Sequence, residues 1–174
     1  MKAGPVRGAI TFVPFAAEHA PLMYDWLRRP HVAEWWSEPP TIDEILDEYV
    51  RGSEVDPFVV HLDGRPIGFI QSYVAAESGD GWWTDVIDRG VRGTDQFIGE
   101  ADALDRGVGT AMVHAFAARL FGDPAVTMVQ VDPSPKNARA IRCYEKAGFE
   151  AQSVIETPDG PALYMTLQRA SFCG

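Results

Sequence analysis

Cysteine is scarce in this sequence, and long apolar stretches are absent. Its 174 residues include two cysteines, Cys143 and Cys173, and neither stands in a Cys-x-x-Cys or Cys/His cluster. A disulfide framework and a structural zinc site are therefore not expected, and this cysteine usage is typical of a reducing cytoplasm. No apolar run approaches the ~20 residues that a membrane-spanning helix needs. Residues 1–10 lack an apolar signal core, so we expect no secretion signal.

Positive charge is also in short supply. Lysine and arginine number 15 against 25 aspartates and glutamates, so the formal net charge is −10. Binding to a nucleic acid or to an anionic membrane is not expected, because phosphate groups need a basic face. An acidic surface would attract a polycationic small molecule. Charge alone favours the simpler interpretation, in which acidity aids solubility.

Histidines with the spacing of metal ligands are missing as well. The four histidines are separated along the chain, and we expect them to be structural. Cys143 has no histidine partner nearby in the sequence, so a buried thiol is expected there rather than a nucleophile. The sequence therefore predicts no metal site.

Residue patterning predicts a single domain over residues 1–174, because one domain accounts for roughly 100–200 residues. Hydrophobic residues make up 46 % and charged residues 23 %, as in ordinary globular proteins. Strand-rich segments come first and are followed by α, β, α, β and β segments, which predicts the α/β (α+β) class with a mixed central sheet flanked by helices. The expected strands are residues 9–15, 57–62, 65–75, 91–98, 125–131, 149–156 and 162–168, and the expected helices are residues 17–28, a segment beginning at Thr41, 107–121 and 136–147.

Local signals mark several of these boundaries. Thr41 and Glu44 have the spacing of a capping box, which predicts a helix start. The pair Asp63-Gly64 is typical of a hairpin turn. Gly148 stands where a helix needs a left-handed C-terminal cap.

The first candidate for chemistry is the glycine loop Arg106-Gly107-Val108-Gly109-Thr110, which opens the expected helix 107–121. A helix start offers unpaired backbone N–H groups and the positive end of the helix dipole. Glycines allow a phosphate to approach that backbone closely, and Arg106 and Thr110 add a charge and a hydroxyl. A pyrophosphate is the natural ligand, although a simple tight turn is the alternative.

The second candidate is the helix that carries Asn137, Ala140 and Tyr144. Their i, i+3, i+7 spacing places them on one helix face, where the small Ala140 leaves room for a ligand. Taken alone, the pattern equally describes Asn137 as an N-terminal cap and Tyr144 as a half-buried ring.

In order and spacing, the glycine loop followed by Asn-x-x-Ala-x-x-x-Tyr-x-x-x-Gly-Phe resembles the GNAT superfamily of acetyl-CoA-dependent N-acetyltransferases. The superfamily usually has Gln or Arg three residues before the first glycine of the loop, whereas this chain has Leu104. Further segments resemble the aminoglycoside 6'-N-acetyltransferases of the Ib type. They are Gly79-Asp80-Gly81-Trp82-Trp83, Thr157-Pro158-Asp159-Gly160-Pro161 and residues 34–36, 71–74, 91–96, 132–135 and 139–144.

This resemblance implies a metal-free reaction in a ternary complex with acetyl-CoA, without an acetyl-enzyme. It makes Asp95 the general base and Tyr144 the general acid that protonates the departing sulfur. A backbone N–H of the strand around residues 95–97 would stabilise the oxyanion. An unperturbed aspartate has a pKa of about 3.9, far below that of an ammonium group, so Asp95 acts directly, acts through a water or mainly binds the amine. The expected cofactor-binding residues are Gln96, Phe97, Arg106, Gly107, Val108, Gly109, Thr110 and Asn137.

The resemblance also implies an acidic acceptor site for a polycation. Each carboxylate would make charge-assisted hydrogen bonds to ammonium groups, and aromatic rings would stack on sugars and attract cations. At least one tryptophan of each adjacent pair, Trp35-Trp36 and Trp82-Trp83, is expected in the core. The expected substrate-binding residues are Trp36, Tyr73, Asp80, Trp82, Asp95, Asp132 and Asp159.

Two other functions remain open from the residues. One is acetylation of another small amine, such as an N-hydroxylysine in siderophore assembly, which would favour a basic rather than an acidic pocket. The other is a non-catalytic acyl-CoA-binding sensor. A monomer and a homodimer are both compatible with the sequence.

Overall fold

The computed structural model describes residues 8–36 and 40–174. Most of residues 1–10, from which we expect no secretion signal, therefore lies outside the described residues. Within the described ranges, no helix combines the length and the apolar character that crossing a membrane requires.

Among the described residues, seven strands form one mixed sheet in the order β1-β2-β3-β4-β5-β7-β6. Strands β4 and β5 pair in parallel, whereas β1–β2, β2–β3, β5–β7 and β6–β7 pair antiparallel. The predicted mixed sheet with flanking helices is thus confirmed. The chain clusters into two compact units, of which unit 1 is Met1–Ser72 with Asp95–Gly109 and unit 2 is Tyr73–Thr94 with Thr110–Gly174.

Unit 1 packs three helices with the first strands. Its helices and strands are β1 (Ile10–Pro14), α1 (Ala20–Leu27), α2 (Pro30–Ala33), α3 (Ile42–Tyr49), β2 (Asp56–Leu62), most of β3 (Arg65–Val74) and the second half of β4 (Val91–Ile98). The predicted capping box is confirmed, because the Glu44 N–H donates to Thr41 Oγ1 and the Thr41 N–H donates to Glu44 Oε2 at 2.7 Å. Trp26, Leu27, Ile45 and Phe69 lie in its buried core, where each large apolar side chain contributes about 1.5–3 kcal/mol.

Two expectations for unit 1 need correction. The single helix predicted over residues 17–28 is a 3₁₀ turn, Ala17–His19, followed by α1, which begins one residue before Pro21. His19 Nδ1 accepts the Ala16 N–H at 2.9 Å and holds this turn. Helix α2 was not predicted, since four residues are too few to display a hydrophobic period.

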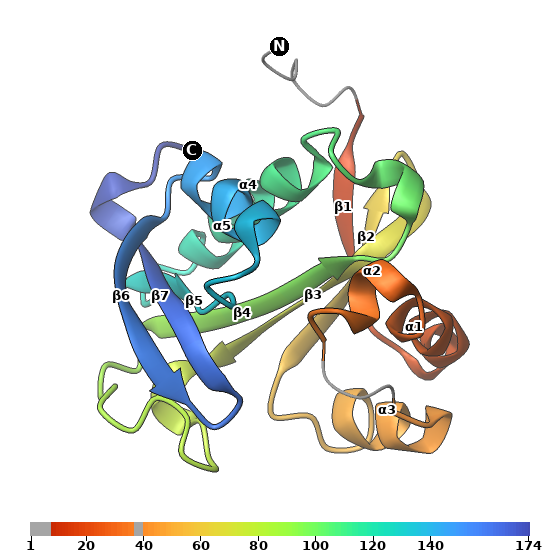
Figure 1. Cartoon of the computed structure of the whole chain (residues 1–174), viewed down its shortest axis with the longest axis horizontal. Coiled ribbons are helices and arrows are strands. Elements are labelled where there is room, and N and C mark those ends of the chain that lie inside the picture. The colour runs from red at the N-terminus through yellow and green to blue at the C-terminus, as the bar shows by residue number, and fades with distance from the viewer. Residues whose placement is uncertain (1–7, 37–39) are drawn as a thin grey trace. The chain divides into compact units, whose positions relative to one another are not determined.

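Unit 2 places two helices against the C-terminal strands (Figure 1). Its elements are part of β4 (Val91–Ile98), nearly all of α4 (Val108–Phe121), β5 (Met128–Val131), α5 (Ala138–Lys146), β6 (Glu150–Thr157) and β7 (Gly160–Gln168). Val113 and Ala117 of α4 and Ala147 after α5 share a core with Val129 and Met165 of the sheet. Gly148 has a φ of 101°, which confirms the predicted left-handed cap.

The strand predicted over residues 125–131 begins only at Met128. Asp123 is the cause, because its Oδ1 accepts the Ala125 N–H and its main-chain oxygen accepts the Val126 N–H. These bonds hold residues 123–126 in a turn, which competes with strand pairing. The other predicted elements end within one or two residues of the observed ones.

Candidate active site

Asp95 lies on β4 in unit 1, where a buried glutamine orients it. Gln71 Nε2 on β3 donates to Asp95 Oδ2 at 2.9 Å, and Gln71 is only 7 % exposed. Tyr49 lies in the same unit. Burial, reinforced by Glu48 and then by Asp95, raises the pKa of the Tyr49 phenol, which therefore stays protonated. The half-buried Asp95 side chain thus lies on a strand beside a fixed donor, a geometry that suits an amine-binding or proton-accepting group.

Aromatic rings surround the next part of β4. The Phe97 ring lies 5.0 Å from the Trp36 ring and 5.6 Å from the Phe69 ring, measured between centroids. The Phe97 side chain is therefore part of an aromatic cluster. Trp36 was predicted to bind substrate; the structure places it half-buried on this cluster. Gly68 allows the close approach of β3, since a Cβ there would lie 2.4 Å from the Phe97 carbonyl oxygen.

Glu100 anchors the segment between β4 and the glycine loop, and the sequence analysis did not single it out. Trp26 Nε1 donates to Glu100 Oε1 at 2.9 Å, and Arg29 Nη1 lies 2.9 Å from Oε2. Arg65 bridges Glu100 and Asp102. The hydrogen bonds from Arg29 and Trp26 hold the pKa of the Glu100 carboxyl below its usual range. No local sequence motif predicts these contacts of Glu100, because the partner residues are 35 to 74 positions away in the chain.

Glu100→Gln is expected to lower the melting temperature at pH 7 by about 3–6 °C, the equivalent of about 1–2 kcal/mol. Because the pKa of Glu100 is lowered by folding, its ionised form stabilises the fold above the ordinary glutamate value of 4.5. That stabilisation is lost as the pH falls through the lowered pKa, so the difference between variant and wild type should shrink in acid. Thermal unfolding from pH 3 to pH 8 measures this.

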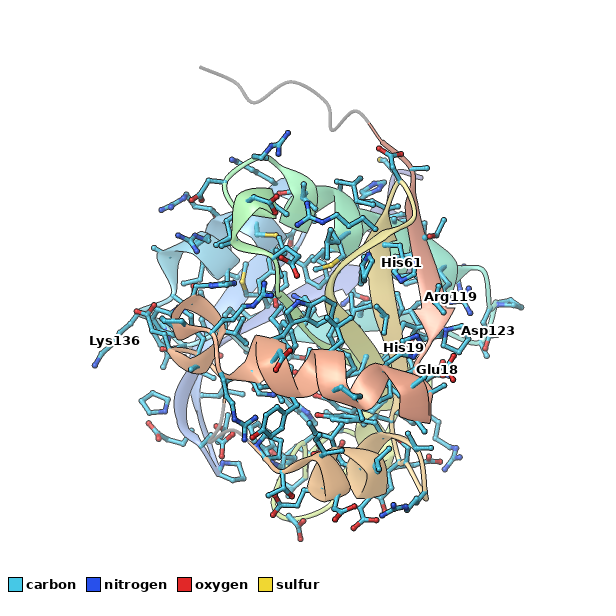
Figure 2. All side chains as sticks on the ribbon, turned by 90° about the vertical axis from the view of Figure 1, so that its right-hand side faces the viewer. Glu18, His19, His61, Arg119, Asp123 and Lys136 are labelled. Carbon is cyan, nitrogen blue, oxygen red and sulfur yellow. The ribbon has the colours of Figure 1, made fainter. Side chains whose placement is uncertain are left out.

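Glu18→Gln is the matched control, because Glu18 is exposed in the 3₁₀ turn that precedes α1 (Figure 2). If the melting temperatures of Glu100→Gln and wild type differ by the same amount at every pH, the ionised form of Glu100 does not stabilise the fold.

The glycine loop has the backbone shape that phosphate binding needs. Asp105 and Gly107 both adopt left-handed conformations, with φ of 57° and 78°, directly before α4 begins at Val108. Such a turn in front of a helix directs backbone N–H groups to one side, where they form an anion-binding concavity. Arg106 is exposed beside it, and its Nη1 donates to the Asp102 carbonyl at 3.3 Å. The predicted residues Arg106, Gly107, Val108 and Gly109 thus lie in a left-handed turn and the first residues of α4, a segment that we call the anion cradle and that has the backbone form of an anion-binding turn.

In unit 2, Thr110 and Asn137 are engaged in local contacts. The Thr110 hydroxyl lies 3.8 Å from Cys143 Sγ, and Asn137 Oδ1 accepts the Ala140 N–H at 3.1 Å as the N-cap of α5. The capping role that the sequence left open for Asn137 is therefore present. Burial raises the pKa of the Cys143 thiol, which disfavours a nucleophilic thiolate.

Tyr144 is a buried residue of α5. It is 7 % exposed, and its ring lies 5.6 Å from the Phe149 ring within the core of unit 2. The ring is thereby fixed by packing. A phenol is a suitable general acid for a departing thiolate.

The predicted acidic acceptor residues of unit 2 lie on its loops. Asp80 is exposed and has a φ of 56°, and the next residue, Gly81, has a φ of 86°. A Cβ on Gly81 would lie 3.7 Å from Pro158 Cγ, so the loop of Asp80 lies beside the turn that carries Asp159. The structure thus brings the segments of these two aspartates together. Asp132 is half-buried directly after β5.

Aromatic residues of unit 2 form a second group. The Trp82 ring lies 6.1 Å from the Trp83 ring, and both tryptophans are half-buried. The expectation that at least one tryptophan of this pair lies in the core is therefore wrong. Trp83 donates its Nε1–H to the Tyr73 hydroxyl at 2.9 Å and packs on Tyr164. Trp83 and Tyr164 were not predicted as functional, and only the adjacency of the two tryptophans in a Gly/Asp-rich loop pointed to this group.

The histidines occupy structural positions on separate elements. Figure 2 shows His19 at the start of α1 and His61 on β2, and His114 Nε2 lies 3.0 Å from the Cys173 carbonyl oxygen. Over residues 8–36 and 40–174, no three His, Cys, Asp or Glu side chains form a group that could hold a metal ion.

The family comparison gives the class of the protein. Residues 16–157 match the acetyltransferase (GNAT) domain family, so the mixed sheet described above is that of a GNAT acetyltransferase. Aminoglycoside N(6')-acetyltransferase type 1 of Klebsiella pneumoniae is 49 % identical over 158 residues, which are 87 % of this chain and 79 % of that protein. The chain belongs to the family of aminoglycoside 6'-N-acetyltransferases.

Two further relatives agree with this assignment. A kanamycin resistance protein of Rhizobium radiobacter is 56 % identical over 91 residues, which are 52 % of this chain and 84 % of that protein. The crystal structure of aminoglycoside acetyltransferase AAC(6')-Ib with coenzyme A and kanamycin matches with a TM-score of 0.90 and 47 % sequence identity. That match covers 94 % of this chain and 97 % of the other.

Proposed function

We propose that this protein transfers the acetyl group of acetyl-CoA to the 6'-amine of aminoglycoside antibiotics of the kanamycin and tobramycin class, and so confers resistance. The observation that carries the proposal is the 49 % identity to an aminoglycoside N(6')-acetyltransferase over 87 % of the chain. We place the reaction in the cytoplasm and assign it no metal. The amine nitrogen bonds to the acetyl carbon while the carbon–sulfur bond breaks, without an acetyl-enzyme.

In this proposal Asp95 binds the acceptor ammonium and takes its proton, directly or through a water. The fixed donor Gln71 supports the role, because it holds the carboxylate in one orientation on β4. A preset geometry of this kind lowers the entropic cost of reaching the transition state. The backbone N–H groups of β4 near Gln96 and Phe97 would stabilise the negative charge that develops on the carbonyl oxygen.

Tyr144 gives its proton to the sulfur of the departing thiolate. Its burial against Phe149 supports this role, because packing holds the hydroxyl in place during the transfer. The anion cradle at Gly107 binds the pyrophosphate of the acyl donor, with Arg106 as an added cation. Thr110 and Asn137 contribute to the same task beside their local contacts.

The acidic loops bind the polycationic acceptor. Asp80, Asp132 and Asp159 pair with its ammonium groups, and charge-assisted hydrogen bonds of this kind contribute roughly 1.5–3 kcal/mol each. Tyr73, Trp82 and Trp36 provide aromatic surfaces for sugar rings and ammonium groups. A net charge of −10 fits electrostatic steering of such a substrate.

The test is release of coenzyme A thiol, detected by a thiol reagent, when an aminoglycoside is added to enzyme and acetyl-CoA. Kanamycin and tobramycin should release thiol. Neomycin B and paromomycin form a matched pair, because they differ only in carrying an amine or a hydroxyl at the 6' position. We expect turnover with neomycin B and essentially none with paromomycin.

Other outcomes favour the alternatives. Thiol release with an N-hydroxylysine acceptor but with no 6'-amino aminoglycoside would assign the protein to siderophore assembly. Tight coenzyme A binding without thiol release from any amine would indicate a sensor.

A further inference from the structure

Gln130 is a fully buried polar side chain that the chemistry above does not use. It lies on β5 of unit 2 with an exposure of 0 %, and its Oε1 accepts the Tyr164 hydroxyl proton at 3.1 Å. Burial raises the pKa of the Tyr164 phenol, so the hydroxyl stays protonated and able to donate. Gln130 Nε2 has no hydrogen-bond partner in the described part of the chain. A buried donor without an acceptor lowers the stability of the fold, because it has lost its hydrogen bonds to water. A leucine at this position would avoid that cost.

From Tyr164 the contacts continue to the tryptophan loop, which we define as residues 78–90. The Tyr164 ring lies 5.7 Å from the Trp83 ring, and Trp83 Nε1 donates to the Tyr73 hydroxyl at 2.9 Å. Trp83 has a φ of 52°, in the left-handed region that bulky side chains rarely adopt. Such a conformation persists only where surrounding contacts impose it. Here Tyr73 and Tyr164 supply those contacts.

The Tyr73 ring packs on the sheet at Gly93. A Cβ on Gly93 would lie 2.1 Å from Tyr73 Cζ and 2.4 Å from the Tyr73 hydroxyl oxygen, so the ring occupies the space that Gly93 leaves open. Gly93 is the register partner of Gln130 between β4 and β5. The Tyr73 ring therefore covers Gly93, the strand position opposite Gln130, and the contacts Gln130–Tyr164–Trp83–Tyr73 return to this part of the sheet.

We propose that Gln130, Tyr164 and Trp83 are positioning residues that set the affinity for the acceptor by fixing Tyr73 and the tryptophan loop with its Asp80. This inference rests on the proposed function, since it concerns how the same enzyme holds its aminoglycoside. None of the three residues is assigned a contact with the acyl donor. The bond from Tyr164 fixes the amide of Gln130, and the amide in turn fixes the ring on which Trp83 packs.

The experiment compares Tyr164→Phe and Trp83→Phe with wild type. Tyr164→Phe keeps the ring and removes the donor to Gln130, whereas Trp83→Phe keeps an aromatic side chain and removes the donor to Tyr73. We expect each variant to raise the KM for kanamycin about threefold to tenfold, the worth of one hydrogen bond. The KM for acetyl-CoA and the kcat at saturation should stay within about twofold of wild type. Tyr24→Phe on α1 of unit 1 is the matched control and should change neither KM.

A double variant separates positioning from simple stabilisation. Gln130→Leu combined with Tyr164→Phe replaces both polar partners by apolar groups, which should restore the melting temperature that Tyr164→Phe lowers. A KM for kanamycin that stays raised in this folded double variant supports positioning. A KM that returns to the wild-type value together with stability would overturn the proposal, as would an equal rise of both KM values in the single variants.

Calorimetric titration of kanamycin onto the coenzyme A complex keeps this inference distinguishable from the proposed function. Wild type that binds kanamycin without turnover, with weaker binding in both single variants, would refute the proposed function and support positioning. Binding of equal strength in wild type and in both single variants would refute positioning alone.

Discussion

Asp95→Asn is expected to lower kcat by about 10²- to 10⁴-fold, the usual contribution of a positioned general base. Asparagine has nearly the shape of aspartate, and its carbonyl oxygen can still accept the Gln71 Nε2 proton that Asp95 Oδ2 accepts at 2.9 Å. The fold should therefore survive while the negative charge and the proton acceptor are lost. Steady-state kinetics with kanamycin and acetyl-CoA, together with the Kd of coenzyme A from calorimetry, measure the effect, and coenzyme A binding should be nearly unchanged.

Asp56→Asn is the control for this variant, because Asp56 is an exposed aspartate at the start of β2. Its kcat should equal that of wild type. Wild-type turnover in Asp95→Asn would reassign Asp95 to structure, and a raised KM for kanamycin at an unchanged kcat would restrict it to binding the ammonium group.

Tyr144→Phe is expected to lower kcat by about 10²-fold, at the lower end of the range for a general acid. Phenylalanine retains the ring that packs 5.6 Å from Phe149, so the core of unit 2 stays filled and the melting temperature should change little. Only the proton donor is removed. The defect should nearly vanish with an acetyl thioester whose thiol is strongly acidic, because such a thiolate leaves without protonation. Comparing kcat for acetyl-CoA and for p-nitrophenyl thioacetate in both proteins tests this.

A loss of the same size with both donors would contradict protonation of the sulfur by Tyr144. Melting curves serve as the control, since a large drop in melting temperature would attribute the loss of turnover to misfolding.

Sequence signals predicted the structure correctly where a feature depends on interactions between residues close together in the chain. The capping box of Thr41 and Glu44, the cap at Gly148 and the start of α4 after Gly107 follow from hydrogen bonds and backbone angles within a few residues. The strand start at Ala125 was wrong for a related reason. Asp123 forms a turn with its own neighbours, and that local contact prevails over the β-branched residues that follow.

The hydrogen bonds that hold the residues of the candidate site in place were not predictable, because they join residues far apart in the chain. Gln71 reaches Asp95 across 24 residues, and Tyr164 reaches Gln130 across 34. Trp26 reaches Glu100 across 74 residues. A glutamine or a glutamate has no pattern of its own that distinguishes such a partner from a solvated surface residue.

By itself, the sequence determined the element types, the glycine loop before a helix, the acidic loops and the family resemblance, since these depend on spacing and on side-chain chemistry along one segment. Only the tertiary structure decided that Phe97 and Trp36 share an aromatic cluster and that Trp83 bridges Tyr73 and Tyr164. The reason is physical. Which polar atoms meet is settled by the register of the strands and by packing, and both arise when distant segments come together.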